Sequence, residues 1–100
     1  MKIQDQGDTL LVSEISELVA ATASQFRDQV RSALLPGHKL IEVDLSQTRF
    51  LDSSGLGALI GLHKSICAQG GAIRLLNLAP VVQQIIELTR MHRVFEIVRR

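Results

Sequence analysis

Hydrophobic and polar positions divide the sequence into short extended segments and longer amphipathic ones. Runs of strand length, apolar or alternating, predict strands at residues 9–13, 40–45, 72–76 and 94–98. Residues 2–6 are short enough to pair with the first of these strands as a hairpin, with Gly7 and Asp8 in the turn. The chain is therefore expected to contain one antiparallel pair near its start.

Two of the segments between these strands have the simple periodicity of amphipathic helices. The first helix presents one apolar face, made of Ala23, Phe26, Val30, Ala33 and Leu34. Pro36 and Gly37 are expected to end it. The last helix is expected to begin at Pro80 and to end near Arg90. Its apolar stripe consists of Val82, Ile85 and Ile86.

Between them lies a middle helix with a broad apolar face. Asp52 and Ser53 are both good N-cap residues for it, and Gly70-Gly71 is expected to end it. The apolar face carries Leu56, Leu59, Ile60, Leu62, Ile66 and Cys67. On this pattern we expect Cys67 to be a small buried apolar residue. His63 lies on the same stripe and is expected to be a core or edge residue, not a ligand.

The resulting order of elements is β-β-α-β-α-β-α-β. Strands that alternate with helices imply right-handed crossovers and a mainly parallel sheet. We therefore predict an α/β fold: a single domain over residues 1–100 with a mixed, mostly parallel sheet of four or five strands and three helices. Sites in such sheets lie at the carboxyl ends of the strands, which directs attention to residues 46–54.

Composition narrows the class of protein. The 100 residues are 46% hydrophobic and 21% charged, which suits one small domain with a core, and the net charge of +1 gives no reason to expect a nucleic-acid partner. No apolar run is long enough to cross a bilayer, and the first residues lack the apolar region of a signal peptide. A single cysteine excludes an internal disulfide and a CxxC motif. We expect a cytoplasmic protein that does not insert into membranes.

The segment Phe50-Leu51-Asp52-Ser53-Ser54-Gly55-Leu56-Gly57 carries the most chemical information. It joins a predicted strand to a helix N-terminus, where backbone N–H groups and the helix dipole favour an anion such as phosphate. An ordinary helix cap in a tight turn explains the same residues.

The middle helix adds a second feature on its polar side. At 100° per residue, one face carries Ser53, Gly57, Gly61, Lys64 and Ala68. Each glycine inside a helix costs roughly 0.5–1 kcal/mol relative to alanine. Two glycines on this face are explained by the close approach of another surface, which is either a partner protein or a neighbouring element of the same chain.

The residues Asp52-Ser53-Ser54-Gly55-Leu56-Gly57, after Val43-Asp44-Leu45-Ser46, resemble the motif of the STAS domain. More closely, the sequence looks like the small stand-alone anti-sigma factor antagonists of bacteria. The resemblance extends from about residue 40 to residue 98 through Gly70-Gly71, Ile73 to Leu76, Asn77, Pro80-Val81 and Val94-Phe95. It covers the first third of the chain only by its pattern.

The resemblance implies a regulatory binding module, not an enzyme, and one with no cofactor or metal. It implies that Ser53 is phosphorylated, with Ser54 as the alternative, by an anti-sigma factor that is also a serine kinase of the GHKL-type ATPase fold. The unphosphorylated antagonist binds this kinase and frees a sigma factor, and a PP2C-type phosphatase resets it. The partner-binding residues implied are Asp52, Ser53, Ser54, Gly55, Gly57, Gly61 and Lys64.

One segment departs from the family pattern. Members commonly carry a Gly-Glu-Leu-Asp-like run before the first helix, where this chain has Ser16-Glu17-Leu18-Val19. Val19 thus replaces an aspartate that lies near the phosphorylated serine in the family. The difference bears on which partner is bound and on whether the kinase reaction occurs.

Two other functions fit less of the sequence. A STAS subunit of another assembly, such as a lipid-transport complex or a signalling scaffold, would dock by the same helix face without phosphorylation. A Ser-His-Asp hydrolase would need a GxSxG elbow, which is absent. The chain also lacks the acidic pair of a receiver domain and any Walker A or GxGxxG match, and His38 and His92 have no metal-ligand spacing.

Overall fold

The computed structural model describes residues 1–100 and is built around a five-stranded sheet in the order β1-β2-β4-β6-β7. The strands are β1 (Lys2–Gln6), β2 (Thr9–Ser13), β4 (Leu40–Asp44), β6 (Ala72–Leu76) and β7 (Glu96–Val98). β1 and β2 form an antiparallel hairpin, with Gly7 in the turn at a φ of 80°. All other neighbours in the sheet are parallel. The predicted mixed, mostly parallel sheet is confirmed.

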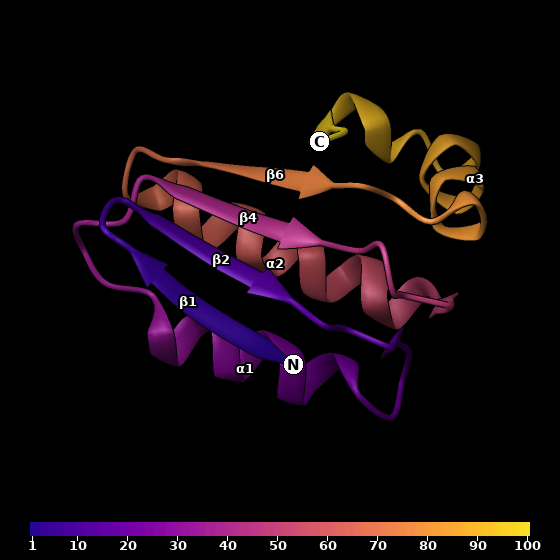
Figure 1. Ribbon diagram of the computed structural model, residues 1–100, viewed down its shortest axis with the longest axis horizontal. Helices are drawn as coiled ribbons and strands as arrows, with labels where there is room; N and C mark the ends of the chain where they lie inside the picture. The colour runs from indigo at the N-terminus through magenta and orange to yellow at the C-terminus, as the bar shows by residue number, and fades with distance from the viewer.

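The structure has three α-helices that alternate with the strands of the main sheet, as predicted. They are α1 (Ala23–Ala33), α2 (Ser53–Ala68) and α3 (Pro80–Leu88), with Pro80 in the first turn of α3. Figure 1 shows α1 and α2 side by side against the same face of the sheet, and α3 beyond the carboxyl ends of the strands. One layer of helix and one layer of sheet thus enclose the core between them.

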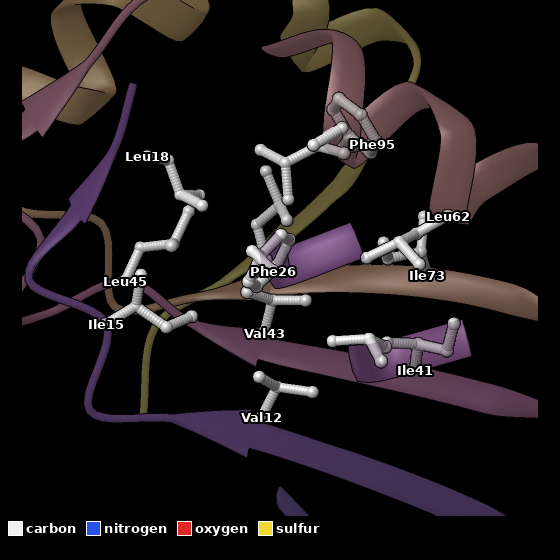
Figure 2. Close-up of a cluster of buried hydrophobic side chains, with 14 of the residues drawn as sticks. Val12, Ile15, Leu18, Phe26, Ile41, Val43, Leu45, Leu62, Ile73 and Phe95 are labelled. Carbon is white, nitrogen blue, oxygen red and sulfur yellow. The ribbon is translucent and has the colours of Figure 1, made fainter. Parts of the chain in front are cut away.

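A single cluster of 21 buried hydrophobic residues forms that core. Figure 2 shows side chains of the strands, such as Val12, Val43 and Ile73, pointing toward Phe26 of α1 and Leu62 of α2. Alternate strand residues supply the sheet side because successive side chains of a strand point to opposite faces. The same alternation leaves the other face of the sheet without a helical cover.

A second, two-stranded sheet was not predicted. β3 (Glu17–Leu18) pairs in parallel with β5 (Phe50–Leu51). A strand of two residues is too short to show a hydrophobic periodicity, so the sequence pattern reveals neither β3 nor β5. This small sheet fixes the segment before α1 against the segment before α2. The end of the chain also differs in detail, because a short 3₁₀ helix, η1 (Met91–Arg93), shortens the last predicted strand.

The prediction that Cys67 is buried is wrong. Its side chain is exposed, because the buried face of α2 is rotated relative to the predicted one, although Leu59, Leu62 and Ile66 belong to both faces. The residues buried on this helix are Gly55, Ala58, Leu59, Leu62 and Ile66. Cys67 lies outside this buried set. His63 is half-buried at the edge, as expected, with its ring 5.8 Å from the ring of Phe95 in an edge-to-face contact.

Candidate functional site

The candidate site is the turn between β5 and α2. Asp52 is the N-cap of α2: its backbone is extended, and its Oδ1 accepts a hydrogen bond from the Gly55 N–H at 3.0 Å. This bond satisfies one of the free backbone donors that every helix start leaves. The sequence prediction that Asp52 can cap this helix is confirmed.

The second carboxylate oxygen of Asp52 reaches a different part of the chain. Its Oδ2 accepts from the Ala20 N–H at 3.0 Å, and the Asp52 N–H donates to the Leu18 carbonyl at 3.1 Å. Asp52 therefore joins the start of α2 to the segment before α1. The hydrogen bond from Gly55 lowers the pKa of the Asp52 carboxyl below its ordinary value of 3.8, and the bond from Ala20 acts in the same direction.

Gly55 is buried beneath this junction and does not face the solvent. A Cβ at Gly55 would lie 2.1 Å from the Leu18 carbonyl oxygen and 2.7 Å from Leu51 Cδ1. Only glycine allows the backbone of α2 to approach β3 so closely. Gly55 thus shapes the site from below, and Asp52 and Gly55 both act on the backbone that carries the serines.

Ser53 and Ser54 are both exposed in the first turn of α2. Ser53 is the first residue of the helix, next to the capped end. An anion there would lie near the positive end of the helix dipole and near backbone N–H groups. The hydroxyl of Ser53 is thus open to a partner while the backbone beneath it is fixed by Asp52.

The polar side of α2 is open at one end and covered farther along. A Cβ at Gly57 would meet nothing within 4 Å. At Gly61, by contrast, a Cβ would lie 3.3 Å from Arg27 Cδ and 3.4 Å from Arg31 Nη2, both side chains of α1. Packing within the chain therefore explains Gly61, while Gly57 faces open space. Lys64 is exposed on the same side of the helix.

The departure at Val19 lies close to this site. Val19 directly precedes Ala20, whose N–H is bound by Asp52, and the Val19 side chain is half-buried. The Thr22 Oγ1 accepts from the Val19 N–H at 3.1 Å, which folds the segment into the start of α1. The register inferred from the sequence thus puts Val19 beside the motif, in agreement with the structure.

An exposed apolar edge beside the motif was not singled out from the sequence. Phe50 is 60% exposed and Val81 46%. Val81 also lines an open cavity of about 660 Å³ at the carboxyl ends of the strands, together with residues of the 46–49 loop. The sequence shows that Phe50 is apolar, but hydrophobic periodicity does not predict that its side chain is exposed.

No group of three or more His, Cys, Asp or Glu side chains is close enough to hold a metal ion.

Comparison with known proteins identifies the class of this fold. The sequence model of the STAS domain matches residues 1–100, so the chain belongs to the STAS domain family. The anti-sigma F factor antagonist of Paenibacillus polymyxa is 26% identical over 98 residues, which cover 97% of this chain and 84% of the relative.

Solved structures agree. A Thermotoga maritima protein, provisionally named an anti-sigma factor antagonist, has a TM-score of 0.89 at 26% identity, over 97% of this chain and 84% of that one. The Bacillus cell fate determinant SpoIIAA, an anti-sigma factor antagonist, shares the fold at 21% identity. Its unphosphorylated form gives a TM-score of 0.85 over 99% of this chain and 86% of its own, and its phosphorylated form gives 0.77 over 99% and 89%. No helix here is long and apolar enough to cross a membrane.

Proposed function

We propose that this STAS domain is an anti-sigma factor antagonist that binds an anti-sigma factor and so releases a sigma factor. Relatives that match nearly the whole chain carry this name, which supports the proposal. The domain acts as a binding module and not as an enzyme. Sigma factors act in the bacterial cytoplasm, and the proposal therefore implies that location.

The proposed switch is phosphorylation of Ser53. The observation that carries it is an exposed hydroxyl at the first position of α2, on a backbone held by both oxygens of Asp52. A rigid, accessible serine suits a kinase that must align the hydroxyl with a nucleotide. The anti-sigma factor itself, with a GHKL-type ATPase fold, would transfer the phosphate, and a PP2C-type phosphatase would remove it.

The proposed docking surface runs from the start of α2 along its polar side. Ser53, Ser54, Gly57 and Lys64 supply its exposed groups, and Gly61 lies beneath side chains of α1. Asp52 and Gly55 contribute by fixing the backbone of the first turn. A phosphate adds about −1.5 to −2 charges to a surface that a partner must desolvate, and so it should release the partner.

Incubation with ATP and purified candidate kinases, followed by mass spectrometry, tests this function. We expect one phosphate on the wild-type protein, none on Ser53→Ala, and one on the matched control Ser54→Ala. Unphosphorylated Ser53→Ala should still bind the kinase. Loss of the phosphate in Ser54→Ala alone would move the acceptor to Ser54.

Val19 favours a second candidate function. In place of the family aspartate it puts an apolar side chain beside the motif, which suits a permanent contact without phosphoryl transfer. The domain would then be a STAS subunit of another assembly, such as a lipid-transport complex or a signalling scaffold. Purification of the protein from its source cell distinguishes the two: an unmodified Ser53 together with a transporter subunit would support this alternative.

A further inference from the structure

Three cations lie on or over the polar side of α2. Arg27 and Arg31 project from α1, and Lys64 projects from α2. Helix α2 has no acidic residue between Ser53 and Ala68, and α1 has only Asp28, which pairs with Arg27 Nε at 3.3 Å. Arg31 and Lys64 have no carboxylate partner. We call Arg27, Arg31 and Lys64 the cationic strip.

Of the two arginines of the strip, Arg31 is hydrogen-bonded to α2 and Arg27 lies close to it. The Arg31 Nε donates to the Ser65 Oγ at 3.2 Å, and that hydroxyl donates to the Gly61 carbonyl at 3.0 Å. Because Gly61 has no side chain, Arg27 Cδ and Arg31 Nη2 can lie close over its backbone. Part of the conformational entropy of these long side chains is thus already lost before any partner binds.

We propose that the cationic strip is a docking surface for an acidic protein surface, and that this surface belongs to the anti-sigma factor. The inference rests on the proposed function for the identity of the partner. A partner that covers Gly57 and the first turn of α2 also reaches the strip, since all of them lie on the same side of α2. Covering unpaired cations is unfavourable unless the partner supplies carboxylates.

The strip also gives the phosphate on Ser53 a specific role. An acidic partner is attracted by the strip and repelled by a phosphate at the end of the same surface. Binding of the unphosphorylated protein should therefore weaken as salt is added, because screening reduces attraction between exposed charges. Phosphorylation would thus add repulsion at one end of a surface that attracts the partner along the rest of its length.

The strip can be tested without any anti-sigma factor. The probe is a helical peptide of Glu and Ala, and the control probe has Gln in place of each Glu. Amide shifts of the labelled domain are followed at low salt. We expect the acidic peptide to shift residues around Arg31, Arg27 and Lys64, and the Gln peptide to shift none. Arg31→Glu should remove these shifts, and the matched control Arg93→Glu, an exposed arginine of η1, should keep them.

Equal shifts around Arg93 and Arg31, or none around Arg31, would overturn the inference. A second measurement separates it from the proposed function. With a purified anti-sigma factor, Arg31→Glu should lower the association rate constant about tenfold at low salt, and Arg93→Glu should leave it nearly unchanged. If no anti-sigma factor binds the wild-type protein, the proposed function fails and the identity of the partner fails with it, while the peptide result still decides whether the strip binds an acidic surface.

Discussion

At the scale of single residues, Asp52 does more than cap a helix. One oxygen holds the Gly55 N–H of its own helix, and the other holds the Ala20 N–H, 32 residues away in the sequence. A serine at this position could accept one of these bonds, but its single oxygen could not hold both in the same geometry. Asparagine keeps one acceptor oxygen and replaces the other with a donor.

Acid should reveal the contribution of Asp52. Because folding lowers its pKa, the stabilisation is fully present above the ordinary value of 3.8 and is lost as the pH falls through the lower folded value. The difference in unfolding free energy between the wild-type protein and Asp52→Asn should therefore be largest at neutral pH. It should shrink at pH values below 3.8.

Denaturant unfolding across this range measures the difference. The matched control is Asp8→Asn in the hairpin turn, since this carboxylate joins no distant segments. The Asp5 carboxylate accepts a hydrogen bond from His38, which also lowers the pKa of Asp5. Because acid therefore also changes the contribution of Asp5 to stability, the variants must be compared with one another at each pH. A difference that stays constant with pH would contradict the role given to Asp52.

At the scale of elements, we expect the same substitution, glycine to alanine, to have opposite effects on stability at two positions of α2. Gly57→Ala should stabilise the protein by about 0.5–1 kcal/mol, because alanine is the better helix former and its Cβ meets open space. Gly55→Ala should destabilise it by about 1–3 kcal/mol, because the Cβ would collide with the Leu18 carbonyl. Thermal unfolding of the two variants measures both effects, and a stable Gly55→Ala would refute the close approach of α2 to β3.

A bulky side chain on the open face of α2 should block docking. Gly57→Arg is the variant to use, because Gly61 already lies under the arginines of α1. We expect a loss of partner affinity of about tenfold or more, as for residues near the centre of an interface. Gly37→Arg is the control, because Gly37 lies in a distant turn and a Cβ there also meets nothing within 4 Å. Equal affinities of the two variants would count against the proposed surface.

At the scale of the whole molecule, phosphorylation of Ser53 should leave the fold nearly unchanged. The helix end favours an exposed anion by about 0.3–1 kcal/mol, and the neighbouring carboxylate of Asp52 opposes it. These small effects have opposite signs and largely cancel. The melting temperature should therefore change little while partner affinity falls strongly.

Amide chemical shifts of the phosphorylated and unphosphorylated domain test whether the fold is unchanged. Changes confined to residues around Ser53 are expected for a direct electrostatic and steric block. Changes that spread over the five-stranded sheet, or a large drop in melting temperature, would instead indicate a switch that reorganises residues 46–54.

The sequence alone determined the order of the strands of the main sheet and of the three α-helices, and the position of the motif. Strands β2, β4 and β6 and the three helices follow from hydrophobic periodicity, and Gly7, Gly70 and Pro80 mark boundaries where the predicted turns and helix start occur. Each of these signals is local, because a period of two or 3.6 and a turn residue depend only on near neighbours.

Only the tertiary structure decided what surrounds the candidate site. The pairing of β3 with β5, the second bond of Asp52 and the arginines over Gly61 all join segments about thirty residues apart. The rotation of α2 that exposes Cys67 likewise depends on how this helix packs against α1, β6 and the small sheet. Such contacts are chosen by packing across the whole core, so no local pattern in the sequence encodes them.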